Sequence, residues 1–388
     1  MSLMLPPPPD LERARKRQRR KRVHLMHSDR YQSLCSLVRA NANRDDMLYA
    51  LIRSCNLCEL LTVVAPGTAS REHLLRYHTQ EYLDALEHPP TNVEELEEYG
   101  LVDDCEVFDG LYDYCSAVAG ASLHAANLLV TGEADVAINW GGGRHHAKKD
   151  EAAGFCYVSD VVLAILHLRK KFRRIAYVDI DVHHADGPME AFVTSSDVMC
   201  VSFHNFAQGF FPGSGACSEA GAGAGRDHTL NVPLREGCGD GPFEAVFSAA
   251  LTEVVKSFDP EVVVLLCGAD TLSADPLGPF NLTTEGVLRC TSKVVGLGLP
   301  LLLLGGGGYC PTAAARLWTV LTAAAIGPHA VEQLPASVPD KDNDFFSEFG
   351  PDFLLHTRAK AMEDLNTPDL VRRRCQFIME ATSRLAKA

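Results

Sequence analysis

The chain has 388 residues, of which 46% are hydrophobic and 22% charged, and its formal net charge is −14 at pH 7. This composition provides enough apolar surface for a full core, so it excludes disorder throughout and fits one large domain or two smaller ones. No apolar run approaches the roughly 20 residues that a membrane helix needs, and residues 1–5 are too few for a signal-peptide core. We therefore expect an intracellular protein without a membrane segment.

The first 22 residues differ in composition from the rest of the chain. They combine a proline run at 6–9 with a basic run at 13–22 that holds eight Lys or Arg residues and no acidic one. Such a segment has too little apolar surface for a core, so we expect a disordered tail at 1–22 and a single folded domain at 23–388. The basic run is typical of nuclear-localisation or polyanion-binding segments, with a merely solvated tail as the alternative.

The charge of the remaining chain is strongly negative. Without residues 13–22, 28 basic residues face 50 acidic ones, a formal charge of −22. A negative body disfavours binding to a nucleic-acid backbone and suits a cationic partner such as a lysine-rich peptide.

From residue 23 onward, short apolar runs alternate with longer helix-like stretches. Apolar runs without polar alternation are typical of strands covered on both faces, which predicts an α/β domain with a mainly parallel central sheet flanked by helices. The expected strands lie in VHLMHS (23–28), LTVVAPG (61–67), ADVAINW (134–140), RIAYVDID (174–181), VMCVSFH (198–204), VVVLLCGAD (262–270) and LPLLLLGGGGY (299–309). Expected helices include 114–130, 159–171, 243–257, 284–296 and 312–325.

Unusual polar and glycine-rich segments follow five of these strands. They are GGGRHHAKKDEAAGF at 141–155, the end of DIDVHHADG at 179–187, HNF at 204–206, GAD at 268–270 and GGGGY at 305–309. Ligands of open parallel α/β sheets bind beyond the carboxyl ends of the strands. We expect these five segments to converge on one pocket.

The segments 179–187 and 268–270 together predict a metal site. Asp179, Asp181 and His183 are spaced by two, so their side chains point the same way on an extended chain. Asp181 and His183, joined by Asp270, would give a site with three oxygen and nitrogen ligands and room for water and substrate, as a catalytic zinc requires. Asp179 is better placed to orient a histidine, although any one of these acidic residues alone could be a strand-end cap.

The adjacent histidines His145 and His146 are the candidate proton-transfer groups. Asp179 and Asp186 are available to orient them, and such pairs fix the tautomer and pKa of an imidazole. Tyr309, after four glycines, could donate a hydrogen bond to a developing oxyanion, with a buried core tyrosine as the alternative. The residues by themselves thus indicate metal-assisted hydrolysis.

Five motifs in order give the chain a specific resemblance. WGGGRHHAKKDEAAGFCY, YVDIDVHHADG, FHNFAQGFFPGSG, LCGADTLSADPLGPFN and LLLGGGGYCPTAAARLW, spread across most of residues 23–388, resemble the zinc-dependent class I histone deacetylases. The resemblance implies the arginase-like α/β fold. Within the class the chain is most similar to members without a long charged carboxyl-terminal tail, because it stops soon after FGPDFLL.

The resemblance also implies a role for each matching position. Asp181, His183 and Asp270 match the zinc ligands, and of the two histidines His146 matches the general base. Tyr309 matches the residue that polarises the acetyl carbonyl. The substrate-binding positions are Gly154, Phe155 and Phe211 in a narrow apolar channel, Leu277 at the pocket wall and Asp104 at the rim. Potassium would bind through Asp179, Asp181, His183, Ser202 and Phe203, and at a second, distant site through Phe192, Ser195 and Val198.

The implied activity is hydrolysis of Nε-acetyl-lysine in histones and other proteins, with Zn²⁺ as cofactor, Fe²⁺ as the alternative metal and K⁺ as a structural or regulatory ion. Acetylated lysine-rich peptides and histone tails are the expected partners, without direct nucleic-acid readout, and the nucleus is the expected location, with the cytoplasm as a further one. Alternatives are a small-molecule deacylase of the acetylpolyamine type, a longer-chain lysine deacylase, and a non-catalytic scaffold, against which the full residue set argues.

Four positions depart from the family pattern. Arg144 stands where an aromatic or aliphatic residue is usual, which puts a permanent cation next to the histidine pair. Asp103 doubles the carboxylate of Asp104, Leu277 replaces a methionine, and His228 replaces a tyrosine. Arg144 and Leu277 leave the acyl-chain preference and the pH optimum open.

Overall fold

The computed structural model describes residues 21–385. Most of the predicted basic tail at 1–22 lies outside the described residues, but its last two residues contact the domain. The Nζ of Lys21 donates to the carbonyl of Val295 at 2.9 Å, and Arg22 forms an ion pair with Asp135 at 2.8 Å. The basic run therefore reaches the body of the protein, because Asp135 offers both of its carboxylate oxygens to Arg22.

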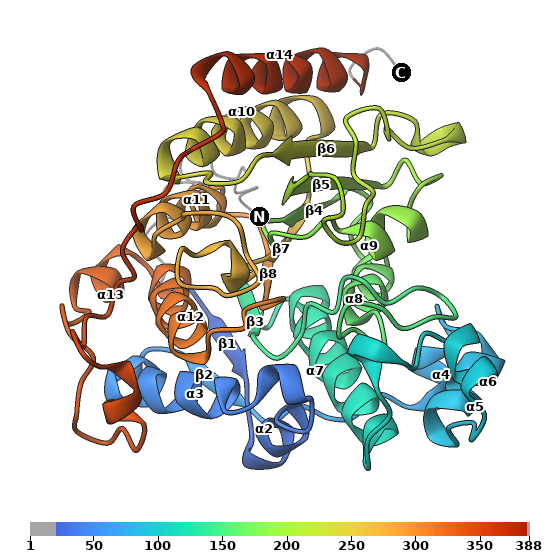
Figure 1. Ribbon diagram of the computed structural model, residues 1–388, viewed down its shortest axis with the longest axis horizontal. Helices are drawn as coiled ribbons and strands as arrows, with labels where there is room; N and C mark the ends of the chain where they lie inside the picture. The colour runs from blue at the N-terminus through green and yellow to red at the C-terminus, as the bar shows by residue number, and fades with distance from the viewer. Residues whose placement is uncertain (1–20, 386–388) are drawn as a thin grey trace, which may run out of the picture.

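The described chain is built around one sheet of eight parallel strands in the order β2-β1-β3-β8-β7-β4-β5-β6 (Figure 1). The strands are β1 Val23–Met26, β2 Thr62–Val64, β3 Val136–Asn139, β4 Ile175–Asp179, β5 Val198–Asn205, β6 Thr229–Leu234, β7 Val262–Leu266 and β8 Leu301–Leu304. The α/β prediction and all seven expected strands are confirmed. The sequence reading missed β6, whose Pro233 is tolerated because β6 lies at the edge of the sheet.

Both faces of the sheet are buried, which explains the continuous apolar runs. Along β7, Val263 and Leu265 enter one core, whereas Val262, Val264 and Leu266 enter the other. Alternate side chains of a strand point to opposite faces, so every position of a central strand must be apolar. The first core is shared with helices α3, α10, α11 and α12, and the second with α2, α5, α7, α8 and α9.

Helices connect the strands on the two faces of the sheet. They are α2 Asp29–Cys35, α3 Arg44–Ser54, α4 Arg71–Leu74, α5 Gln80–Glu87, α6 Val93–Glu98, α7 Leu111–Thr131, α8 Asp160–Leu168, α9 Asp186–Ala191, α10 Asp240–Phe258, α11 Thr284–Gly296, α12 Pro311–Ile326, α13 Pro328–Glu332 and α14 Pro368–Leu385. The five expected helices correspond to α7, α8, α10, α11 and α12. Several have side-chain caps at their first turn; for example, Ser159 accepts from the amide of Val162 at the start of α8.

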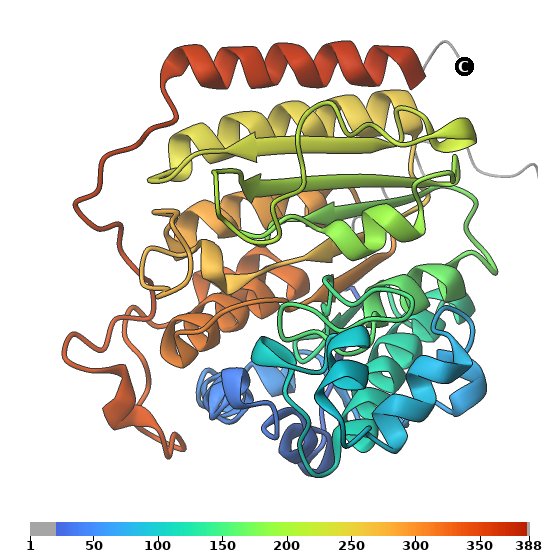
Figure 2. The same cartoon turned by 45° about the vertical axis from the view of Figure 1, so that its right-hand side comes forward.

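The carboxyl-terminal helix α14 lies along the outer side of α10, beyond the β6 edge of the sheet (Figures 1 and 2). Its Ile378 and Ala381 belong to the first core, which ties the end of the described chain to the domain. Among residues 21–385, no helix has the length and apolar character needed to cross a lipid bilayer.

Candidate active site

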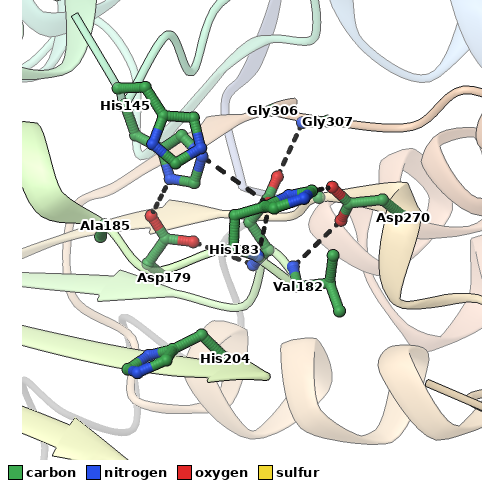
Figure 3. Close-up of polar contacts among 12 residues, drawn as sticks. His145, Asp179, Val182, His183, Ala185, His204, Asp270, Gly306 and Gly307 are labelled. Atoms are coloured by element: carbon green, nitrogen blue, oxygen red, sulfur yellow. Dashed lines mark hydrogen bonds and ion pairs between the residues drawn. The ribbon is translucent and has the colours of Figure 1, made fainter. Parts of the chain in front are cut away.

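The segments that follow β4 and β7 bring three side chains with metal-ligating groups together. Asp181, His183 and Asp270 can each place one ligand atom within 4.8 Å of the other two. Figure 3 shows the His183 ring next to Asp270, and its Nδ1 lies 3.1 Å from Asp181 Oδ1 and 3.1 Å from Asp270 Oδ2. The structure thus places the three predicted ligands at one point.

The extended-chain argument that pointed to these residues was wrong in one respect. Strand β4 ends at Asp179, and the chain then curls instead of continuing as a strand. The amide of Asp181 donates to Asp179 Oδ1 at 2.9 Å, and the amide of His183 donates to Asp181 Oδ1 at 3.0 Å. Asp181 and His183 still meet, but because of these local turns, and Asp179 is left free to contact His145.

The glycines around the trio leave space for a bound ion. A Cβ added at Gly307 would lie 2.2 Å from Asp270 Oδ2 and 2.9 Å from Asp181 Oδ2, and one added at Gly268 would lie 2.3 Å from the same Asp181 atom. Only glycine allows the backbone so close to both carboxylates. Two carboxylates and one imidazole in a buried cradle fit a divalent cation of the zinc or iron(II) class.

The charges of the trio affect one another strongly. Burial and the negative charge of Asp181 raise the pKa of Asp270 to about 8. Burial opposes ionisation of Asp181 too, but His145 and His183 outweigh it and hold the pKa of Asp181 well below its usual range. Burial would lower the pKa of His183, but its bonds to the two carboxylates raise it to about 10. These shifts show that the two carboxylates gain from a positive charge placed next to them.

The two adjacent histidines form separate pairs with the two predicted orienting carboxylates. Nδ1 of His145 lies 2.8 Å from Asp179 Oδ2, and Nδ1 of His146 lies 2.7 Å from Asp186 Oδ1, with the two imidazole centroids 4.0 Å apart. Because an ionised carboxylate only accepts, each Nδ1 carries a hydrogen and donates it to the carboxylate. Each Nε2 is then available for a contact with another group. This places Nε2 of His145 3.7 Å from Asp181 Oδ1 (Figure 3).

The environments of the two histidines push their pKa values apart. Burial disfavours the charged form of His145, but Asp179 and Asp181 reverse the balance and raise its pKa to about 9. Burial and the positive charge of His145 lower the pKa of His146 to about 3. Such a pair provides one protonated and one unprotonated imidazole at neutral pH, which is the division that general acid–base catalysis requires.

Lys148 belongs to this arrangement, although the sequence reading did not identify it. Its ammonium lies 2.7 Å from Asp186 Oδ2 and 3.2 Å from Glu190 Oε2. His146 and then Lys148 outweigh the effect of burial and lower the pKa of Asp186. Two residues from His146, Lys148 thus keeps the carboxylate that orients His146 ionised.

Tyr309 is held by a second residue that the sequence reading missed. Asp275 Oδ2 accepts from the amides of Tyr309 at 2.7 Å and Cys310 at 3.3 Å. Burial and the charges of Asp270 and Asp181 hold the pKa of Tyr309 well above its usual range, so the phenol stays protonated and can donate. The partner carboxylate lies 34 positions away, and no local pattern marks it.

Aromatic side chains surround the histidines and Tyr309. The Phe211 ring lies edge-on to His146 at 4.8 Å, and the Phe155 ring lies 5.4 Å from Tyr309. Phe210, which the sequence reading missed, stacks on His183 at 5.2 Å. A Cβ at Gly154 would lie 2.5 Å from the His146 ring, which explains the glycine at this position.

The predicted rim and pocket-wall residues are exposed. Asp103 and Asp104 lie on the 3₁₀ turn Asp103–Cys105, and the Leu277 side chain is 48% exposed. The structure therefore places two carboxylates in solvent on this turn.

The predicted potassium positions fall on the β4 and β5 side of the trio. Asp179 pairs in register with Ser202, whose Oγ accepts from the amide of Ala185 at 3.3 Å and lies 2.9 Å from His204 Nδ1. The Phe203 side chain packs in the core, so only its backbone could serve as a ligand. At the predicted second potassium site, the amide of Ser195 donates to the carbonyl of Phe192 at 2.9 Å, and Val198 begins β5.

Comparison with known proteins assigns this arrangement to a family. Residues 24–325 match the family model described as "Histone deacetylase domain". Histone deacetylase 8 from Xenopus tropicalis is 44% identical over 358 residues, which cover 91% of this chain and 95% of the relative. Histone deacetylase 8 from Danio rerio is 42% identical, with 90% and 92% covered. Histone deacetylase 1 from Homo sapiens is 41% identical, with 87% and 70% covered. The chain therefore belongs to the histone deacetylase family of metal-dependent amide hydrolases.

Proposed function

We propose that this protein hydrolyses Nε-acetyl-lysine in proteins to lysine and acetate, with zinc held by Asp181, His183 and Asp270. The proposal rests mainly on one observation: the buried trio lies beside a histidine pair in which each imidazole contacts its own carboxylate. A bound divalent cation would polarise the acyl carbonyl and lower the pKa of a water molecule.

The chain's own residues would move the protons. His146 is unprotonated at neutral pH, and Asp186 fixes its tautomer, so its Nε2 can take a proton from the attacking water. Protonated His145 adds positive charge beside the reaction centre. As the bond between the acyl carbon and the lysine nitrogen breaks, a histidine returns a proton to the leaving amine. Tyr309 would donate a hydrogen bond to the oxyanion, and Asp275 sets its backbone position.

Phe155, Phe211 and Gly154 would bind the lysine side chain. Their apolar surface suits a neutral acylated lysine, because a charged ammonium would lose its hydration there. Leu277 at the wall and Asp104 at the exposed rim, with Asp103 beside it, would meet the backbone and the basic flanks of a lysine-rich peptide or histone tail.

We also propose potassium binding through Asp179, Asp181, His183, Ser202 and the backbone of Phe203, and nuclear localisation through the basic run at 13–22. The described part of this run, Lys21 and Arg22, is bonded to the domain. Residues 13–20 would therefore carry the localisation function.

Metal removal and replacement tests the central claim. A strong chelator should abolish turnover of an acetyl-lysine peptide, and stoichiometric Zn²⁺ should restore it, because the site needs a cation to balance its carboxylates. Parallel reconstitution with Fe²⁺ would identify the better metal, and runs in KCl and NaCl would reveal a potassium requirement. Full activity in chelated protein with no measurable bound metal would contradict the proposal.

A further inference from the structure

Close to the metal trio, two arginines are buried together, with the carboxylate of Asp45 beside one and that of Asp160 at the backbone of the other. Arg44 begins α3 and is 1% exposed, and Arg144 precedes the histidine pair and is 3% exposed. Among the described residues, the one ion pair of these two guanidinium groups joins Arg44 Nε to Asp45 Oδ1 at 3.8 Å, which is too long for a hydrogen bond. Asp160 accepts from the backbone amide of Arg144 at 2.7 Å, so it leaves the guanidinium of Arg144 without an ion pair among the described residues.

Several polar atoms of this cluster have no hydrogen-bond partner within residues 21–385. They are Arg44 Nε and Nη2, Arg144 Nε, the Tyr114 hydroxyl and Asp45 Oδ1. Buried polar groups, and above all charged ones, normally find a partner, because an unpaired buried donor is costly. Three of the five unpaired atoms are guanidinium nitrogens, which can only donate. The cluster therefore presents buried guanidinium donors to an acceptor that residues 21–385 do not supply.

The cluster lies one peptide unit from the metal trio. Arg44 Nη1 donates to the carbonyl of Gly306 at 3.2 Å, and Arg144 Nη2 lies 3.5 Å from the same oxygen. The next amide, that of Gly307, donates to Asp181 Oδ2 at 2.7 Å (Figure 3). Arg144 Nη2 also bonds the carbonyls of Gly141 and Gly142 at 3.2 and 3.3 Å, on the segment that leads to the histidines. One peptide group, Gly306–Gly307, thus contacts both arginines through its carbonyl and a metal-ligand candidate through its amide.

We infer that Arg44 and Arg144 form a buried carboxylate-binding site that accepts acyl groups ending in a carboxylate, such as malonyl or succinyl. This inference rests on the proposed amide hydrolysis. Water adds to the acyl carbon, and the bond between the acyl carbon and the lysine nitrogen breaks. The nitrogen gains a proton, which gives lysine and the free dicarboxylate. Arginine suits the role because it stays charged when buried and its planar fork matches a carboxylate.

Three peptides of one sequence, carrying acetyl-, succinyl- or succinamyl-lysine, test the inference. The succinamyl group is the neutral counterpart of succinyl, with a carboxamide in place of the terminal carboxylate. Wild-type kcat/KM for succinyl should exceed that for succinamyl by about tenfold. Arg144→Met should lower this ratio about tenfold, and Arg144→Lys, which keeps the charge, should retain most of it. Each ratio is taken within one protein, so a general loss of activity cancels.

The outcomes separate this inference from the proposed function. If the acetyl peptide is hydrolysed but the wild type does not favour succinyl over succinamyl, the carboxylate site is refuted and the deacetylase proposal stands. If Arg144→Met leaves the ratio unchanged, Arg144 is excluded from the site. A second measurement needs no variant: free succinate should inhibit acetyl-peptide hydrolysis more strongly than succinamide. Equal inhibition would overturn the inference as well.

Discussion

The two ends of the parallel sheet both carry charged pairs, but in opposite environments. At the carboxyl ends, the His145–Asp179 pair has side-chain exposures of 3% and 0%. At the amino ends, the Arg22–Asp135 pair is 36% and 41% exposed, and Arg174 pairs with Asp259, which is 83% exposed. Water screens the second kind of pair and competes for its hydrogen bonds, whereas the buried pair keeps its electrostatic strength.

The buried pairs at the carboxyl ends serve the reaction, whereas the exposed pairs at the amino ends attach neighbouring segments of the chain to each other. At the carboxyl ends, burial and neighbouring charges together lower the pKa of His146, whereas the adjacent carboxylates outweigh burial and raise the pKa of His145. Exposed charges at the amino ends hold neighbouring segments together with little energy. Substitutions should therefore have their largest effects on turnover at one end and only small effects on stability at the other.

The largest effect is expected from the proton-transfer and oxyanion groups. His146→Ala should lower kcat on an acetyl-lysine peptide by about 10²- to 10⁴-fold, and Tyr309→Phe by about 10²- to 10³-fold, with the melting temperature almost unchanged. Steady-state kinetics and thermal unfolding provide the measurements. Asp135→Asn, at the amino end, is the control and should keep wild-type kcat. Normal turnover in either active-site variant would remove that residue from the mechanism.

An intermediate effect is expected from Lys148, which bridges the buried site and its exposed surroundings. Lys148→Met removes the ammonium that holds Asp186, so kcat should fall about tenfold while KM stays near the wild-type value. Lys148→Arg should recover most of the rate, because it restores a donor to the same carboxylate.

Glu190→Gln is the matched control for Lys148. It removes the charge of Glu190, the other partner of Lys148. The Glu190 side chain is 62% exposed, so this substitution should change kcat less than twofold. If Lys148→Arg proves as slow as Lys148→Met, charge on this residue has no role in positioning Asp186.

The smallest effect is expected at the amino ends. Removing residues 1–20 retains the Arg22–Asp135 pair, whereas removing 1–22 eliminates it. The second truncation should be less stable than the first by about 0.5–1 kcal/mol, and the difference should shrink in high salt. Urea unfolding at two salt concentrations measures this. A difference of several kcal/mol would contradict this expectation and show that Lys21 and Arg22 contribute much more to stability than exposed pairs do.

The shorter truncation also tests localisation. Removal of residues 1–20 should reduce nuclear accumulation in cells without changing peptide hydrolysis. An unchanged distribution would reject the role proposed for the basic run.

Sequence reasoning found the elements whose pattern is local. Seven strands could be placed because each is a continuous apolar run, but β6 was missed because Asn231 and Pro233 interrupt its pattern. The metal trio and the histidine pair were identifiable because rare residue types cluster directly after the predicted strands. The step from Asp179 to His183 was misjudged as extended, since no residue type there signals the turns that the backbone amides make.

What the sequence alone determined is thus the parallel sheet, the end of it that carries the chemistry, and the identities of Asp181, His183, Asp270, His145, His146 and Tyr309 as a group. Only the tertiary structure decided which carboxylate meets which histidine, that Lys148 and Asp275 support the site, and that Arg44 lies beside Arg144. The physical reason is range: residue periodicity reports neighbours a few positions apart, whereas the bonds from Gly306 to Arg44 and Arg144 join residues 262 and 162 positions apart. Such contacts exist only once the two cores have packed against the sheet.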